Sequence, residues 1–103
     1  MTCEVEKQDG ALHIRGEMTI YAAATLKENL FAALEQETQL CILDLAQISE
    51  FDTTGMQMLL MAQRACVARG LSFAIANPSE IVREALDLVR SPQLTVTNAG
   101  AGA

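Results

Sequence analysis

The sequence is poor in basic residues. Seven lysines and arginines stand against 13 aspartates and glutamates, which gives a net charge of −6. Proteins that bind nucleic acids or anionic membranes non-specifically do so through clustered Lys and Arg side chains that neutralise phosphate groups. The charge balance therefore argues against both kinds of partner.

Long apolar runs are also missing. The longest, LCILDLA and MLLMA, have the length of core segments and fall far short of the roughly 18 apolar residues that a membrane-spanning helix needs. The first ten residues, MTCEVEKQDG, are polar and lack the apolar centre of a signal peptide. We expect a cytoplasmic protein if the source is bacterial.

Metal-binding and disulfide patterns are absent as well. Cys3, Cys41 and Cys66 are odd in number, far apart in sequence and without a C-x-x-C spacing. Cys41 and Cys66 stand among apolar residues, which favours buried, reduced thiols. His13 is the single histidine, so a structural zinc site lacks paired ligands.

The motifs of common enzymes do not occur either. The chain contains neither G-x-G-x-x-G nor G-x-x-x-x-G-K-[ST], the two common phosphate cradles, and no G-x-S-x-G that would support a Ser–His–Asp set with His13. Asp44, Glu50 and Asp52 are close in sequence and could bind a divalent cation, but solvated loop carboxylates are far commoner. We predict a protein that is not an enzyme and has no metal or cofactor.

The sequence does contain predicted strands that alternate with predicted helices, in a number that fits one domain. Its 103 residues are half apolar, enough for one packed core. Period-two alternation predicts strands over Cys3–Lys7 and Ala11–Gly16, joined by an Asp9–Gly10 turn. The i, i+4, i+7 spacing that starts at Leu26 predicts a helix over Ile20–Gln36, with Thr19 as its N-cap.

The second half continues the alternation. The apolar runs predict buried strands, and the caps and periodicity predict helices. We expect a strand at Leu40–Leu45, a loop at 46–54, a helix from Gly55 to Arg69 ended by Gly70, a strand at Leu71–Ala76, a helix with Asn77 as N-cap ended by Pro92, and an edge strand at Leu94–Thr97. The order β-β-α-β-α-β-α-β predicts an α/β fold with a single mixed sheet of four to five strands and three helices, over residues 1–97. Residues 98–103 should form a flexible tail.

The stretch EFDTTG, residues 50–55, is ambiguous on its own. Asp52 or Thr53 could simply cap the following helix, because Asp, Ser and Thr are preferred N-caps. The same position would also suit a modified hydroxyl. A phosphate there would meet the positive end of the helix dipole and would bring nearly two negative charges into a partner surface.

The helix after this stretch carries more apolar residues than one sheet can cover. Met56, Leu59 and Leu60 belong to one stripe, and Met58 and Met61 to another. Either neighbouring helices cover the second stripe, or part of it, Met61 above all, is an exposed methionine-rich docking surface.

The segment CILDLAQISEFDTTGMQMLL resembles the signature of the STAS domain, the family of anti-sigma factor antagonists. Its Asp44–Leu45 pair is similar to the end of the family's buried strand, and Asp52 to Met56 is similar to the Asp-Ser/Thr-Ser/Thr-Gly-Leu motif at the next helix start. IRGEM and ARGLSFAIANPSEIVREAL also resemble family segments, so the likeness covers about residues 3–97.

The resemblance implies a switch and its partners. In the family, the hydroxyl directly after the motif's Asp is phosphorylated by a histidine-kinase-like serine/threonine kinase that doubles as an anti-sigma factor, and a phosphatase reverses the mark. That hydroxyl is Thr53 here, supported by Asp52, Thr54 and Gly55. The expected partner surface comprises Glu50, Phe51, Met56, Met58 and Met61. Members also act in chemotaxis and two-component pathways, or as non-phosphorylated subunits of larger assemblies such as lipid-transport ATPases.

Overall fold

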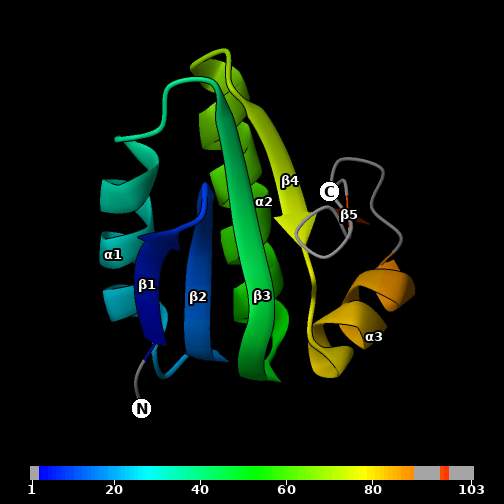
Figure 1. Cartoon of the computed structure of the whole chain (residues 1–103). Coiled ribbons are helices and arrows are strands. Elements are labelled where there is room, and N and C mark those ends of the chain that lie inside the picture. The colour runs from blue at the N-terminus through cyan, green and yellow to red at the C-terminus, as the bar shows by residue number, and fades with distance from the viewer. Residues whose placement is uncertain (1–2, 90–95, 98–103) are drawn as a thin grey trace.

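A computed structural model describes residues 3–89 and 96–97 of the chain. These residues form one mixed sheet with strand order β1-β2-β3-β4-β5, in which β1 and β2 are antiparallel and the other neighbours are parallel. The strands are β1 (Cys3–Gln8), β2 (Ala11–Met18), β3 (Leu40–Phe51), β4 (Ser72–Ala76) and β5 (Val96–Thr97), and the helices are α1 (Ala23–Leu34), α2 (Thr53–Ala68) and α3 (Glu80–Val89). Helix α2 lies behind β3, α1 lies beside β1, and α3 follows the end of β4 (Figure 1). The predicted α/β class and element order are confirmed.

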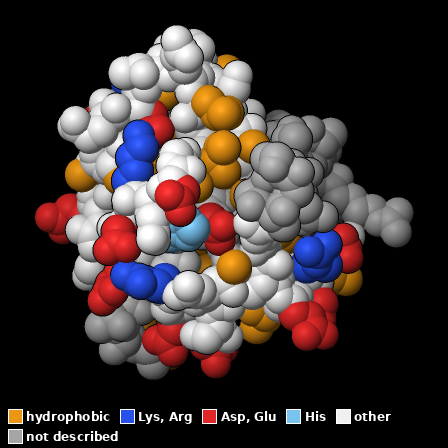
Figure 2. Space-filling model, in the orientation of Figure 1, with side chains coloured by type: hydrophobic (Ala, Val, Ile, Leu, Met, Phe, Trp, Pro, Cys, Tyr) orange, Lys and Arg blue, Asp and Glu red, His pale blue; other side chains and the backbone are white. Residues whose placement is uncertain are grey.

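The N-terminal hairpin forms as predicted. Strands β1 (Cys3–Gln8) and β2 (Ala11–Met18) pair from Cys3↔Gly16 to Gln8↔Ala11. The turn residues Asp9 and Gly10 have φ values of 54° and 82°, which suit the two central positions of a type I′ turn. On the face seen in Figure 2, charged side chains gather over β1 and β2. Arg15 on β2 forms ion pairs with Glu4 and Glu6 on β1.

Strand β3 (Leu40–Phe51) is six residues longer than the predicted strand, and the predicted loop at 46–54 is largely strand. Its extension pairs with the C-terminal part of β2, through Met18↔Phe51 and across two register shifts. Ala46, Gln47 and Glu50 are exposed, so the extension lacks the apolar run by which a central strand is recognised. The backbone pairing that β2 provides, and not side-chain hydrophobicity, makes it a strand.

Helix α1 (Ala23–Leu34) starts three residues later than predicted, and Thr19 is not its N-cap. Residues 19–22 form a turn, in which the Ala22 N–H donates to the Thr19 carbonyl at 3.0 Å. The Ile20 N–H donates instead to a carboxylate oxygen of Asp52, 32 residues along the chain. This long-range bond, invisible in the local sequence, holds residue 20 outside the helix.

Helix α2 (Thr53–Ala68) starts two residues before the predicted Gly55 and ends one residue before the predicted Arg69, and the predicted stop at Gly70 is confirmed. Gly70 has a φ of 77°, and the N–H groups of Gly70 and Leu71 donate to the carbonyls of Val67 and Cys66. That pair of bonds is a Schellman motif, which needs a residue that tolerates a left-handed backbone. Strand β4 (Ser72–Ala76) follows and pairs with β3 from Leu40↔Ser72 to Asp44↔Ala76.

Helix α3 (Glu80–Val89) does not use Asn77 as its N-cap, so that prediction is wrong. Asn77 has a φ of 48°, and its side-chain amide donates to Oδ2 of Asp44 at 3.0 Å. The Arg83 N–H bonds the Ser79 carbonyl, which places the helix start two residues later. Strand β5 (Val96–Thr97) pairs with β4. Pro92, Leu94 and the predicted tail at 98–103 lie outside the described residues.

One core lies between the sheet and the helices, and all three cysteines are buried in it as free thiols, which confirms the prediction for Cys41 and Cys66. Burial raises the pKa of Cys3 to about 11 and also raises the pKa values of Cys41 and Cys66.

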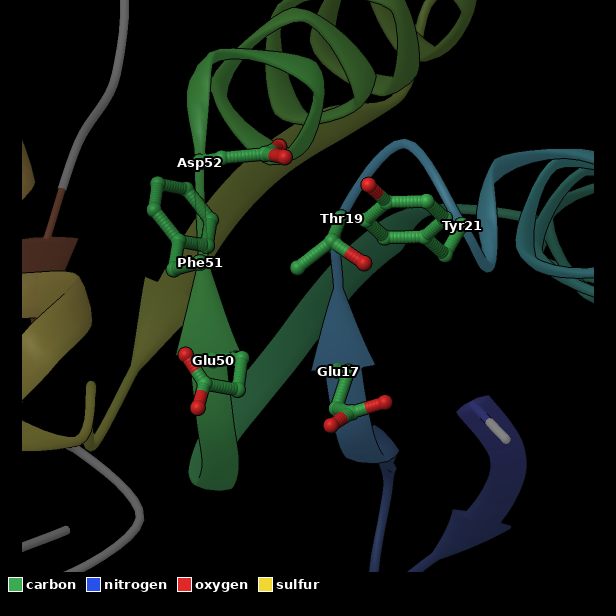
Figure 3. A pocket seen from close by; sticks show the side chains of 6 residues that line it. All are labelled: Glu17, Thr19, Tyr21, Glu50, Phe51 and Asp52. Atoms are coloured by element: carbon green, nitrogen blue, oxygen red, sulfur yellow. The ribbon is translucent and has the colours of Figure 1, made fainter. Parts of the chain in front are cut away.

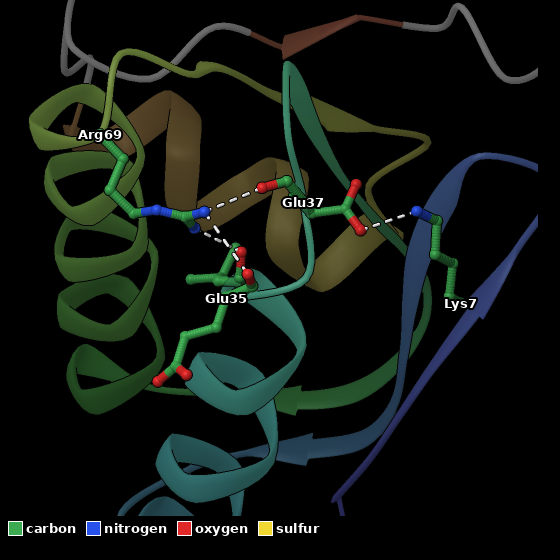
Figure 4. Close-up of polar contacts among 5 residues, drawn as sticks. Lys7, Glu35, Glu37 and Arg69 are labelled. Carbon is green, nitrogen blue, oxygen red and sulfur yellow. Dashed lines mark hydrogen bonds and ion pairs between the residues drawn. The ribbon is translucent and has the colours of Figure 1, made fainter.

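At the end of the sheet away from the Asp52 motif, Arg69 donates to the carbonyls of Leu34, Glu35 and Glu37, and Lys7 pairs with the buried Glu37 at 2.8 Å (Figure 4). These contacts fasten the α1–β3 connection to α2 and β1.

Candidate functional site

Asp52 joins the start of α2 to the turn that follows β2. One carboxylate oxygen, Oδ1, accepts the N–H groups of Thr54 at 2.9 Å and Gly55 at 3.3 Å, so Asp52 is the N-cap of α2. The other, Oδ2, accepts the Ile20 N–H at 3.2 Å, and the Asp52 N–H itself donates to the Met18 carbonyl. Of the two capping residues left open by the sequence, the structure selects Asp52.

Gly55 is required by close packing at the same place. A Cβ on this residue would stand 2.6 Å from the Met18 carbonyl oxygen and 2.7 Å from a ring carbon of Phe51. Contacts this short do not occur in packed proteins, and one of the two neighbours is backbone. The first turn of α2 therefore rests directly on the ends of β2 and β3, which fixes the position of the residues before it.

Thr53 is the first residue of α2 and is exposed, whereas Thr54 is half-buried. Thr53 is not the N-cap, so its hydroxyl is not needed to accept the free N–H groups at the start of α2. The Thr54 and Gly55 N–H groups, which a phosphate at a helix start would otherwise bind, are already taken by Asp52. A phosphate on Thr53 would thus either compete with the Asp52 carboxylate or point outward, and both outcomes change the surface more than the fold.

The predicted partner surface is only partly exposed. Met56 and Met58 are 7% and 6% exposed and belong to the core, so their assignment to a docking surface is corrected. Helix α2 contacts α1 as well as β3 and β4, so neighbours on more than one side cover its apolar stripes. Met61 is half-buried and, with Gln57, Leu60 and Arg64, lines a hollow of about 330 Å³ on α2. Glu50 is exposed and Phe51 half-buried.

A second hollow, of about 300 Å³, lies where β2 and β3 end (Figure 3). Its lining combines Glu50, Phe51 and Asp52 with Thr19, which the sequence had assigned only as a helix cap, and with Glu17 and Tyr21, which it had not singled out. Tyr21 and its neighbour Ile20 are 80% and 65% exposed. The sequence held one indication of this exposure, since neither residue falls on the apolar helix face formed by Leu26, Leu30 and Leu34. Both residues were nevertheless assigned to the same helix as that face.

The three carboxylates considered for a cation do not come together. Asp44 lies on β3, is 8% exposed, and binds the Asn77 amide and the Ala46 N–H. Glu50 and Asp52 lie toward the other end of β3. Within residues 3–89 and 96–97, no three Asp, Glu, His or Cys side chains form a metal-binding group. His13 on β2 is half-buried, with Nδ1 3.8 Å from Oδ2 of Asp44.

Replacing Asp52 with alanine should remove both its capping bonds to the Thr54 and Gly55 N–H groups and its bond to the Ile20 N–H. We expect the free energy of unfolding to fall by about 1–2 kcal/mol, since loss of an Asp N-cap costs about that much. The Ile20 amide should also exchange its hydrogen faster, which hydrogen exchange followed by NMR would measure. Asp52→Asn is the matched control, because Asn caps equally well, and it should retain most of the stability. Equal losses in both variants would contradict the capping role.

The described helices are all too short or too polar to span a membrane. The chain matches the STAS domain family over residues 2–94. Among curated proteins, a sequence search finds no match.

Solved structures share the fold. The anti-sigma factor antagonist SpoIIAA in its unphosphorylated form superposes with a TM-score of 0.70 at 22% identity, over 97% of this chain and 92% of that one. The phosphorylated form of SpoIIAA, a Bacillus cell fate determinant, gives 0.65 at 21% identity, over 97% and 96%. A DUF3478 family protein with a SpoIIAA-like fold from Shewanella loihica gives 0.52 at 14% identity, over 99% and 88%. Since the family match spans nearly the whole chain and the fold agrees, the protein belongs to the STAS domain family.

Proposed function

We propose that this STAS domain is a cytoplasmic regulatory protein that works by reversible binding to a protein partner and is switched by phosphorylation of Thr53. The kinase is a serine/threonine kinase of the histidine-kinase-like class that also acts as an anti-sigma factor, or its counterpart in a chemotaxis or two-component pathway. A phosphatase resets the switch. The domain itself performs no catalysis.

The observation that supports this proposal is that Asp52 caps α2 while Thr53, the next residue, does not. Asp52 caps α2, so the neighbouring hydroxyl is exposed, fixed in place by the Gly55 contact, and unused by the fold. Such a hydroxyl is open to a kinase, and a phosphate on it that points outward leaves the cap and the core in place. SpoIIAA, which shares the fold, is described in both unphosphorylated and phosphorylated forms.

The test is incubation of the full chain with ATP and each candidate kinase encoded near its gene, followed by mass-spectrometric mapping of the phosphate. We expect one phosphate on Thr53 and none on Thr53→Ala. The matched control is Thr54→Ala, which should be labelled as well as the wild type. A phosphate on another residue, or labelling of Thr53→Ala, would show that the site is assigned wrongly.

The second candidate is a constitutive subunit of a larger assembly, such as a lipid-transport ATPase, with residues 52–55 as a docking point. It is favoured by the capped, closely packed helix start, which is a rigid contact surface without modification. Failure of every candidate kinase to label the chain, together with co-purification in a stable complex, would support this reading over the switch.

A further inference from the structure

Two buried thiols lie together at the end of the sheet away from the Asp52 motif. Cys41 is the second residue of β3, Cys66 lies in the last turn of α2, and the two are 0% and 1% exposed. Cys41 shares its face of β3 with Leu43 and Leu45, which are buried in the same core. Neither thiol takes part in the proposed switch at the other end of the sheet.

The backbone brings the two cysteines together. The Cys66 carbonyl accepts the Leu71 N–H in the bonds that end α2, and the next residue, Ser72, starts β4. Ser72 pairs with Leu40, the residue directly before Cys41. The two side chains meet between β3 and α2, where the thiols form a hydrogen bond to each other. Thiols in contact need only a small further approach of their sulfur atoms to form a disulfide.

A cluster of charged side chains lies against this pair (Figure 4). Glu37, in the connection between α1 and β3, is 5% exposed and pairs with Lys7 at 2.8 Å. Arg69 donates to the Glu37 carbonyl at 3.0 Å. The Glu37 charge and one cation of the cluster act on each thiol. We call these three residues the clasp, because they hold the connection closed beside the buried thiols.

We propose that Cys41 and Cys66 are a modification site, a thiol pair that hydrogen peroxide oxidises to an intramolecular disulfide when the clasp opens. The proposal goes beyond the regulatory function above and does not depend on it. Peroxide is small and uncharged, so a brief local opening is enough to admit it. The bond would tie β3 to the last turn of α2 and close a loop, residues 41–66, that contains the start of α2.

Cys66 is the better placed of the two thiols to react first. Burial raises its pKa, but the Cys41 thiol and the Arg69 charge act in the opposite direction. Burial also raises the pKa of Cys41, and there the Cys66 thiol and the Glu37 charge add to the effect. Peroxide therefore meets a more readily ionised sulfur at Cys66, and the thiolate is the reactive form.

The oxidation proceeds in two steps. The Cys66 thiolate attacks one peroxide oxygen, the O–O bond breaks, and Cys66 becomes a sulfenic acid. Cys41 then attacks the Cys66 sulfur, so that the S–S bond forms as the S–O bond breaks. The two thiols supply two protons and two electrons, which reduce one peroxide to two water molecules.

The experiment is treatment of the reduced full chain with hydrogen peroxide, followed by denaturation, alkylation and peptide mass spectrometry. We expect a cross-linked peptide pair that contains Cys41 and Cys66, with Cys3 alone alkylated. The matched control is Cys3→Ala, which should form the same cross-link, because Cys3 lies toward the other end of the sheet, opposite Gly16. A cross-link through Cys3, sulfinic acid without a cross-link, or three thiols that stay free under peroxide that oxidises the unfolded chain would overturn the proposal.

The role of the clasp has its own test. Lys7→Gln leaves the buried Glu37 carboxylate without its cation, so the connection should open more often and the cross-link should form about tenfold faster. If peroxide reached the closed pair instead, loss of the Lys7 charge would disfavour the Cys41 thiolate and slow the reaction. The matched control is the exposed Lys27→Gln on α1, which should leave the rate unchanged. An unchanged or slower rate in Lys7→Gln would refute the gating.

The effect of the bond on the fold can be measured on the same oxidised sample. We expect its urea midpoint to fall when dithiothreitol is added, because the cross-link restricts the unfolded chain. Dithiothreitol does not reduce methionine sulfoxide, so damage to the methionines cancels in this comparison. Peroxide-treated Cys41→Ala should show the same midpoint with and without dithiothreitol. A midpoint that rises on reduction of the wild type would mean that the fold does not accommodate the disulfide.

Discussion

Replacing Gly55 with alanine should lower the free energy of unfolding by about 2 kcal/mol, because forcing extra atoms into a packed site costs up to about 3 kcal/mol and the helix preference of alanine returns about 1 kcal/mol. The new Cβ would stand 2.6 Å from the Met18 carbonyl oxygen and 2.7 Å and 2.8 Å from two carbons of the Phe51 ring. Alanine is favoured over glycine inside a helix by about 1 kcal/mol, and this gain offsets only part of the cost. Urea denaturation followed by circular dichroism would measure the loss.

The matched control is Gly70→Ala. Gly70 has a φ of 77°, but a Cβ on it meets no atom within 4 Å, so only backbone strain opposes the change. That strain costs about 1–2 kcal/mol. Gly55→Ala should be the more damaging variant even though its backbone is helical and unstrained. A smaller loss at Gly55 than at Gly70 would mean that the start of α2 does not rest on β2 as tightly as the structure shows.

Replacing Thr53 with glutamate should weaken binding to the partner by about tenfold or more, the loss that about 1.4 kcal/mol represents. The added carboxylate would project beside Phe51 and Asp52, where a bound partner would exclude water and leave the charge poorly solvated. The fold should be unaffected, because an acidic side chain in the first turn of a helix is stabilising. Titration calorimetry with the kinase and thermal unfolding would give the two quantities.

Thr53→Gln separates charge from size, since its side chain matches that of glutamate without the charge. We expect it to bind the partner within about threefold of the wild type. If glutamine weakened binding as much as glutamate, the effect would be steric and a charge switch would be unsupported. If Thr53→Glu unfolded the domain, Thr53 would have a structural role that the capping by Asp52 does not suggest.

Several elements of the fold were predictable because their signals are local. The Asp9–Gly10 turn, the apolar face of α1 at Leu26, Leu30 and Leu34, and the stop at Gly70 each depend on a few neighbouring residues, and all are confirmed. The errors concern residues whose structure depends on distant contacts. The second half of β3 is a strand because β2 pairs with it, and Ile20 lies outside α1 because Asp52 binds its N–H.

The candidate site divides in the same way. The sequence alone indicated that a helix begins close to residues 52–55 and that Asp52 or Thr53 caps it, because preferences for capping residues act within one turn. The structure selected Asp52 as the cap. The sequence could not determine that Met56 and Met58 are buried, because their periodicity does not say which neighbour covers which stripe. Only the tertiary structure decided that, because α2 packs against α1 as well as against β3 and β4. It also decided that Glu17, Tyr21 and Glu50 share one hollow, because the parallel pairing of β2 with β3 brings together residues that lie about thirty positions apart in the chain.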